Sequence, residues 1–221
     1  MTFFRRPRFP ATTALLLAWL GTAPGARADI AIANFCGDTN PLAISIKLAS
    51  GETAKLGDFT SGQITGFLAL ENRPTDFLFV HPTLGTKTIT LQPTNSPHFL
   101  LFAQIRMTNA PGKEPAPALF LQKYPVTAGQ AKGYRAINLG EQPATLLLDG
   151  KKKVKCPPSE KQPEIVDLSP AKSATVAREN GADPVTYTPE EDTPFLVILY
   201  PVAGPKKFDW TAQPLPPPGA K

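Results

Sequence analysis

Short apolar runs separated by turn residues recur along most of the chain. Over Leu42–Leu48, apolar residues alternate with small or polar ones, and this period of two is typical of a half-buried strand. Comparable runs follow at intervals of about 8–12 residues, the spacing expected of β-sandwiches and small barrels. The 26 prolines leave few stretches that could form a long helix. The pattern therefore predicts an all-β fold of antiparallel strands.

The predicted strands form two groups. Phe77–Val80 and Phe99–Phe102 are apolar on both faces, which suits central strands. The first group comprises residues 42–48, 77–80, 86–91, 99–102 and 119–121, and the second comprises 134–139, 144–148, 152–156, 165–168, 174–177 and 195–200. These groups predict two tandem antiparallel β-sandwich domains of immunoglobulin-like type, at residues 29–125 and 133–210.

Three segments are expected to lie outside the sheets. Residues 126–132 consist mainly of small residues and form the predicted linker between the two domains. Glu179–Thr193 is polar and acidic, so we expect a long surface loop. Residues 211–221 are rich in proline, which lacks a backbone donor for sheet pairing, and are expected to form a flexible tail.

The N-terminal residues carry the features of a secretory signal peptide. Arg5, Arg6 and Arg8 precede the uncharged stretch Ala11–Ala23, and small residues stand at Ala26 and Ala28. We expect cleavage after Ala28, so that residues 1–28 are removed and the mature chain is exported to the periplasm or the medium. The uncharged stretch is shorter than the ~20 residues that a membrane-spanning helix needs. The mature chain is therefore expected to have no integral membrane segment.

Removal of the signal peptide changes the charge of the protein. It takes away four arginines and no acid, so the formal net charge falls from +5 to +1. A nearly neutral chain lacks the excess of cations that binding to nucleic acid requires. Lys151–Lys153 and Lys155 form a local basic run, either as an edge strand protected against strand addition, which we favour, or as a site for an anionic polymer.

Both cysteines, Cys36 and Cys156, lie in the predicted mature chain. Export permits a disulfide. If the two residues pair, the bridge closes a loop of about 120 residues and contributes about 4–5 kcal/mol to stability in the chain-entropy model. The alternative is two isolated structural thiols.

No catalytic or metal-binding arrangement stands out in the sequence. His81 and His98 each adjoin a proline at a predicted strand boundary, so we expect strand-end residues rather than general bases. The acidic cluster Glu190–Asp192 falls in the predicted loop, where solvation accounts for it. The motifs of serine hydrolases, phosphate-binding loops and dinucleotide-binding folds are missing. We predict no catalytic residue, no metal ligand and no cofactor.

Four aromatic residues stand near the linker and the end of the second group: Tyr124, Tyr134, Phe208 and Trp210. Exposed aromatic side chains often form surfaces that bind sugars or proteins, because they supply contact area at a small entropy cost. The alternative is packing in a core or between the two domains, which is the commoner role.

The two groups of strands begin in the same way. A strand ends in Asn and an apolar residue, a short polar turn follows, and an alternating strand returns to a Gly. The first copy consists of Ile32–Phe35, Pro41, Leu42–Leu48 and Gly51, and the second consists of Ala136–Leu139, Pro143, Ala144–Leu148 and Gly150. An Asn at this position can hydrogen-bond its own turn. The similarity predicts an internal duplication.

Two such repeats behind a signal peptide resemble exported tandem β-sandwich proteins, among them the periplasmic accessory proteins of alginate O-acetylation. Residues 30–104 and 133–201 would be the two copies. The chain departs from the pattern by an insertion at Cys36–Asn40 and by the acidic loop. The resemblance implies an adaptor in an envelope complex that modifies a polysaccharide, without catalytic residues of its own.

We therefore expect an exported, non-enzymatic adaptor, scaffold or binding module of the cell envelope. Its partners would be envelope proteins or a polysaccharide. Two other functions stay open on the sequence alone: a hydrolase with its site at the domain interface, and a carrier of a small apolar ligand.

Overall fold

The computed structural model describes residues 28–70, 73–92, 98–108, 111–112, 114–125, 134–140, 142–148, 152–158, 166–167, 174–176, 185–187, 195–202 and 208–214. These residues form strands, turns and loops and contain no helix, which confirms the all-β prediction. No helix that could cross a membrane is found in this part of the chain. Residues 1–27 of the predicted signal peptide, the predicted linker at 126–132 and the cluster Glu190–Asp192 lie outside it.

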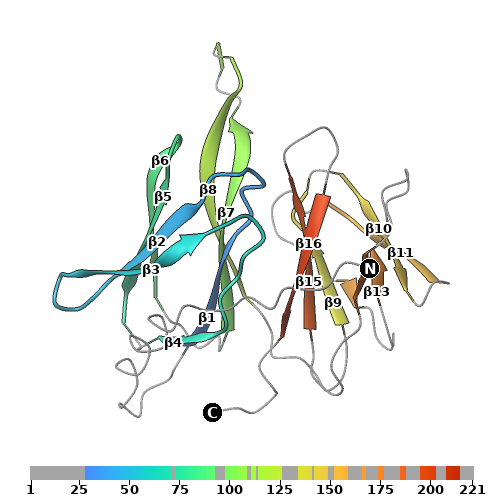
Figure 1. Cartoon of the computed structure of the whole chain (residues 1–221), viewed down its shortest axis with the longest axis horizontal. Helices are drawn as coiled ribbons and strands as arrows, with labels where there is room; N and C mark the ends of the chain where they lie inside the picture. Colours follow the sequence, from blue (N-terminus) through green and yellow to red (C-terminus); the bar gives the residue numbers. More distant parts are fainter. Residues whose placement is uncertain are drawn as a thin grey trace.

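The first half of the chain forms two four-stranded sheets, with strand orders β4-β1-β7-β8 and β3-β2-β5-β6 (Figure 1). The strands are β1 (Ala28–Asn34), β2 (Leu42–Lys47), β3 (Thr53–Phe59), β4 (Leu68–Leu70), β5 (Thr75–His81), β6 (Gly85–Leu91), β7 (His98–Thr108) and β8 (Ala116–Pro125).

The second half repeats this organisation, with strand orders β12-β9-β15-β16 and β11-β10-β13-β14. The strands are β9 (Tyr134–Asn138), β10 (Ala144–Leu148), β11 (Lys152–Cys156), β12 (Val166–Asp167), β13 (Ala174–Val176), β14 (Val185–Tyr187), β15 (Phe195–Pro201) and β16 (Phe208–Pro214). Adding eight to each strand number of the first half gives the order in the second. The predicted internal repeat is thus confirmed in strand order and pairing.

One strand pair in each half runs parallel, so the expectation of purely antiparallel sheets was wrong. β1 pairs in parallel with β7, and β9 pairs in parallel with β15. Both pairs lie in the middle of their sheets, between antiparallel neighbours. Period-two alternation shows which face of a sheet a residue occupies but carries no information on strand direction. Parallel partners also come from distant parts of the chain, so the local sequence does not reveal them.

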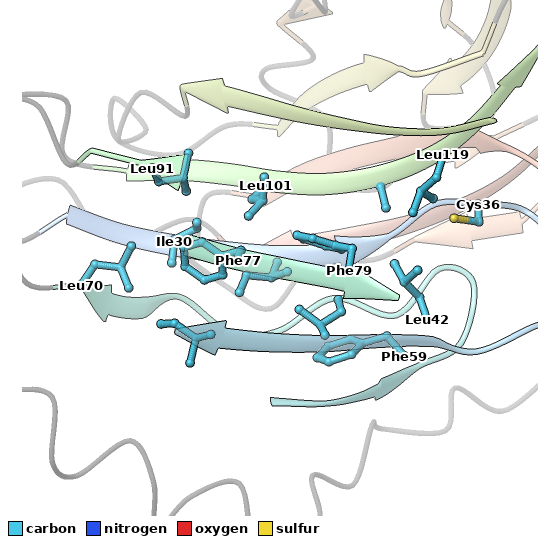
Figure 2. Close-up of a cluster of buried hydrophobic side chains, with 14 residues drawn as sticks. Ile30, Cys36, Leu42, Phe59, Leu70, Phe77, Phe79, Leu91, Leu101 and Leu119 are labelled. Atoms are coloured by element: carbon cyan, nitrogen blue, oxygen red, sulfur yellow. The ribbon is translucent and has the colours of Figure 1, made fainter. Parts of the chain in front are cut away.

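The two sheets of the first half enclose an apolar core (Figure 2). Alternate residues of β2 and β5 point inward, and Ile44, Phe77 and Phe79 are fully buried. From the opposite sheet, Ile30 and Leu101 enter the same core. Each large aliphatic or aromatic side chain buried in this way contributes about 1.5–3 kcal/mol, so this core supplies much of the stability of the first half.

A second apolar cluster joins the two halves. Its members are Ala31, Ala33, Phe35, Leu100 and Phe102 from the first half and Ile137, Leu139, Leu196, Ile198 and Tyr200 from the second half. The sheet β4-β1-β7-β8 therefore lies between the sheet β3-β2-β5-β6 and the second half of the chain (Figure 1). Consequently residues 100–104 of β7, which include most of the unbroken apolar run, are buried on both faces.

β5 is also a central strand, as predicted, but only one of its faces is buried. Val80 is 41% exposed, whereas Phe77 and Phe79 have no exposed surface. No second sheet covers the outer face of the sheet that contains β5 in the described part of the chain, whereas the second half covers the outer face of β7.

Several strands lie where no strand was expected. β14 falls within the predicted acidic loop, and β16 continues into the predicted proline-rich tail, with Pro214 paired to Phe195. The lysine run lies on an edge strand, which is the favoured alternative: β11 is at the edge of its sheet, and Lys152, Lys153 and Lys155 are exposed on it. Lysines at such an edge hinder the addition of a further strand.

Two buried asparagines hold the equivalent turns of the two halves. The Asn34 side chain donates to the Phe59 carbonyl at 2.7 Å and accepts from the Cys36 backbone N–H at 2.9 Å. The Asn138 side chain donates to the Cys156 carbonyl at 3.2 Å and accepts from the Gly140 backbone N–H at 2.9 Å. Phe59 ends β3 and Cys156 ends β11. In each half, an asparagine side chain therefore links the end of the first strand to the opposite sheet by a hydrogen bond.

Replacement of either asparagine by alanine should destabilise the protein by about 1–3 kcal/mol, because buried backbone groups lose their partners. Chemical denaturation of Asn34→Ala and Asn138→Ala measures this cost. Thr88→Ala, on the exposed face of β6, is the matched control and should change stability by less than about 0.5 kcal/mol. Asparagine variants as stable as this control would contradict the structural role.

Candidate functional site

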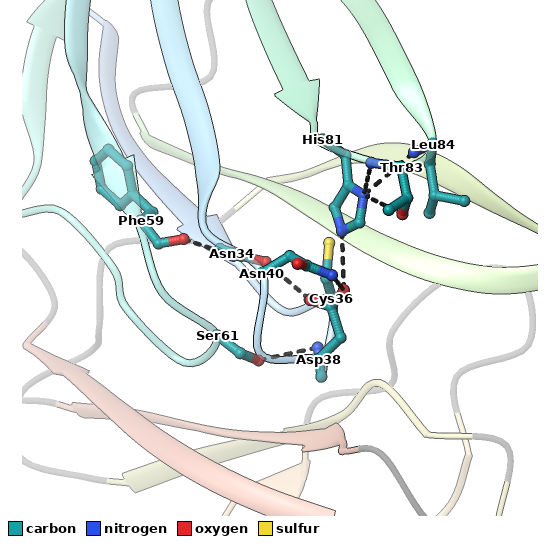
Figure 3. Close-up of polar contacts among 10 residues, drawn as sticks. Asn34, Cys36, Asp38, Asn40, Phe59, Ser61, His81, Thr83 and Leu84 are labelled. Atoms are coloured by element: carbon teal, nitrogen blue, oxygen red, sulfur yellow. Dashed lines mark hydrogen bonds and ion pairs between the residues drawn. The ribbon is translucent and has the colours of Figure 1, made fainter.

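A cluster of polar side chains lies at one end of the first half, where the turn after β1 meets the turn between β5 and β6 (Figure 3). The segment Cys36–Asn40 supplies a thiol and a carboxylate, and His81 at the end of β5 supplies an imidazole. Ser61 approaches from the turn after β3, where its hydroxyl accepts from the Gly37 N–H at 2.9 Å. A nucleophile, a base and an acid are therefore gathered at this end of the sheets.

His81 forms hydrogen bonds through both ring nitrogens. Nδ1 accepts from the backbone N–H groups of Thr83 and Leu84, each at 3.3 Å. The ring proton must then be on Nε2, which donates to Asp38 Oδ2 at 3.0 Å. The ring is only 1% exposed. Neither nitrogen is left to accept a proton from a substrate or a nucleophile.

Asp38 is oriented by two donors. Its Oδ2 atom accepts from His81 and also from the Asn40 side chain at 2.9 Å, while its Oδ1 atom is buried without a hydrogen-bond partner. This pattern aims the carboxylate at the histidine. The pair anchors the Cys36–Asn40 turn against the β5–β6 hairpin.

The Cys36 thiol is protected rather than activated. Burial, and secondarily the nearby Asp38 carboxylate, raises the pKa of Cys36 to about 12. The thiolate is the nucleophilic form of cysteine, and reactive cysteines have a lowered pKa. Although the three residue types match those of a cysteine hydrolase, their arrangement stabilises a turn and offers no activated nucleophile.

The same turn presses against the second half of the chain. Gly37 has a positive φ of 77°, and a Cβ atom there would collide with the Pro201 backbone carbonyl. Gly62, with φ of 83°, leaves no room for a Cβ beside the Tyr200 hydroxyl. Both positions require glycine for the backbone conformation and for the close approach.

The second histidine lies at the opposite boundary of a strand. His98 begins β7, and its Nδ1 atom is 3.3 Å from Asp29 Oδ2, in a geometry that does not make a hydrogen bond. Its ring and the Phe67 ring form an edge-to-face contact with a centroid distance of 5.8 Å. His81 and His98 are thus both buried strand-end residues, as the flanking prolines suggested.

The two cysteines do not form the disulfide that was considered. Cys36 lies in the core of the first half, whereas Cys156 is buried at the end of β11 in the second half. Cys156 occupies the position equivalent to Phe59, because each pairs with the first residue of the preceding strand in its own sheet, Ala144 of β10 and Leu42 of β2. The cysteines therefore belong to the interiors of different halves.

The four aromatic residues of the predicted binding surface are only partly placed. Tyr124 on β8 is half-buried and packs against the cluster between the halves, and this burial raises the pKa of its phenol. This residue therefore follows the packing alternative. Tyr134 lies on β9, and Phe208 and Trp210 lie on β16; the structure describes their backbone only. Trp210 pairs with Leu199 in the ladder.

Sequence reasoning missed three residues that organise this region: Asp38, Gln104 and Tyr200. The first partners His81, and the other two lie between the halves. One signal was present for Gln104, because it is the first polar residue after the unbroken apolar run of β7. Among the described residues, no group of three or more His, Cys, Asp or Glu side chains could hold a metal ion.

Comparison of the chain with models of known protein families gives no match, and comparison with curated proteins gives none either.

The Cys36 thiol should be almost inert in the folded protein. In a Cys156→Ala background at about pH 8, alkylation by iodoacetamide should be at least about 100-fold slower than in concentrated urea, because the thiolate is rare and buried. The folded state should also lose stability as the pH rises above the ordinary thiol pKa, because only the unfolded chain then releases the proton. Comparable alkylation rates in the two conditions would refute the assignment.

A double-mutant cycle should reveal coupling between His81 and Asp38. The His81→Ala/Asp38→Ala double variant should lose about 1–3 kcal/mol less unfolding free energy than the sum of the losses in the two single variants. The reason is that either single change leaves a buried group unpaired. The exposed pair Lys55–Asp58, at 2.7 Å, is the control and should couple by less than about 1 kcal/mol. Equal coupling in both pairs would argue against an anchoring role.

Proposed function

We propose that the protein is an exported, non-enzymatic adaptor, scaffold or binding module of the cell envelope. In this proposal residues 1–28 direct export and are removed, and two tandem immunoglobulin-like β-sandwich domains remain. The link to polysaccharide modification comes from the resemblance of the repeats to accessory proteins of alginate O-acetylation.

The observation that carries the proposal is that the Cys36–Asp38–His81 cluster has neither an available base nor an activated nucleophile. Both imidazole nitrogens are engaged, the histidine is buried, and the thiol pKa is raised. A hydrolase needs a base with a nitrogen available to the nucleophile and a nucleophile of lowered pKa or activated by that base. The hydrogen bonds of this cluster favour a structural use of the same residue types.

The joint between the halves adds support for a scaffold. It combines a continuous apolar cluster with a hydrogen bond from the Gln104 side chain to the Leu139 carbonyl, at 2.8 Å. An apolar joint of this kind restrains relative motion of two domains more than a polar one does. Surfaces carried by the two halves would then be presented to partners at a fixed spacing and orientation.

The proposal is tested by affinity purification of the tagged mature chain from an envelope extract. Recovery of enzymes that modify an exported polysaccharide, retained after nuclease treatment and a salt wash, is the expected result. The purified chain should at the same time leave p-nitrophenyl esters unhydrolysed.

Two results would favour the alternatives. Ester turnover that disappears in His81→Ala, with stability compensated by added osmolyte, would establish a hydrolase. An apolar molecule released from the purified protein by organic extraction, in an amount equal to the protein, would establish a carrier. Either result without an envelope partner would replace the adaptor proposal.

A further inference from the structure

The two halves can be aligned residue by residue from their hydrogen bonds. The Phe35 N–H donates to the Ala103 carbonyl at 2.9 Å, and the Leu139 N–H donates to the Leu199 carbonyl at 2.8 Å. Asn34 pairs with Ala103 in the parallel ladder of the first half, and Asn138 pairs with Leu199 in that of the second. This alignment makes Phe35 equivalent to Leu139.

The same alignment shows that both halves use equivalent positions at their joint. The equivalent pairs in the apolar cluster are Ala33 and Ile137, Phe35 and Leu139, Leu100 and Leu196, and Phe102 and Ile198. In the first half these residues lie on the face of the sheet that points away from the core shared with the sheet β3-β2-β5-β6. In the second half Asn138, which stands between Ile137 and Leu139, bonds the Cys156 carbonyl of the opposite sheet, so its two neighbours point the other way. The two halves therefore meet through the same face rather than front to back.

The contacts across this joint are reciprocal. Gln104 follows Ala103, and Tyr200 follows Leu199, so these two residues are also equivalent. The Gln104 side chain donates to the Leu139 carbonyl at 2.8 Å. The Tyr200 ring stacks on Phe35 with a centroid distance of 5.0 Å. Gln104 of the first half thus contacts Leu139 of the second half. Their equivalents, Tyr200 of the second half and Phe35 of the first half, also contact each other.

We infer that the two halves are joined as an isologous pair, related by an approximate twofold axis. Reciprocal contact between equivalent surfaces is the defining property of a twofold interface in homodimers. The β1–β7 face is therefore an interaction surface, and the partner it fits is the equivalent face of a second repeat. In this chain residues 134–214 provide that partner, so the chain is a covalently fused dimer.

Exchange of equivalent residues in the full-length chain tests this inference. One variant exchanges Phe35→Leu with Leu139→Phe, and a second exchanges Gln104→Tyr with Tyr200→Gln. The first removes the stacking of Tyr200 on Phe35 and leaves the backbone carbonyl of residue 139 in place, whereas the second removes both contacts. The four-residue variant restores both contacts at exchanged places. Each exchange alone should raise the unfolding equilibrium constant by some factor. The four-residue variant should have an unfolding equilibrium constant at least about fivefold smaller than the product of these two factors predicts.

A combined effect equal to or worse than that product would overturn the twofold relation. Hydrogen exchange on single variants gives an independent measurement should the exchanged chains fail to fold. Tyr200→Ala should lower protection of the Phe35 amide in the opposite half, and Gln104→Ala should lower protection of the Leu139 amide. Thr88→Ala on β6 is the control and should change neither. A crossed effect in one direction only would also overturn the inference.

Discussion

The burial of both faces of the β1–β7 pair is the constraint on which the architecture depends. Leu101 and Ala103 enter the core of the first half, while Leu100 and Phe102 enter the cluster shared with the second half. No position from 100 to 103 can therefore be polar. Each large side chain of this run would cost about 1.5–3 kcal/mol if exposed. The joint is thus part of the fold and could not be opened without loss of stability.

The sequence predicted strands where it carries period-two alternation, as over Leu42–Leu48, or a short apolar run, as over Phe77–Val80 and Phe99–Phe102. Leu42–Lys47 and Lys152–Cys156 match their predicted strands closely. β3 escaped prediction because the β2–β3 register shifts between Ile44 and Ser45. Leu56 and Phe59 consequently face the same core although they are three residues apart. A β-bulge changes the parity of a strand, and a period-two pattern then disappears from the sequence.

The polar cluster shows a different limit of prediction. His81 and Asp38 are 43 residues apart. His81 ends β5 and Asp38 lies in the turn after β1, and at both places a polar residue would be expected without any partner. Their meeting depends on β2 and β5 pairing so that both turns reach the same end of the sheets. The buried asparagines were easier to predict, because an Asn side chain that bonds the residue two positions later acts within its own turn.

Fusion of the two halves removes a restriction that a true homodimer must obey. In a homodimer every substitution changes both sides of the interface, whereas here Gln104 and Tyr200 end the same apolar strip in different ways. Gln104 reaches a backbone carbonyl across the joint, while the Tyr200 ring covers Phe35 and its hydroxyl bonds Asp209.

The larger Tyr200 side chain fits because Gly62 leaves space at its hydroxyl. The first half thus supplies the glycine that the tyrosine of the second half requires. Reciprocal geometry with unequal side chains means that each face is adjusted to the other half of the same chain. This adjustment favours intramolecular closure over pairing with a second molecule, because a like-with-like contact would bring Gln104 or Tyr200 against a surface not shaped for it. The adaptor proposal therefore places the binding surface for a partner away from the joint. In the described part of the chain, the outer face of the sheet β3-β2-β5-β6 is one surface that the joint leaves uncovered.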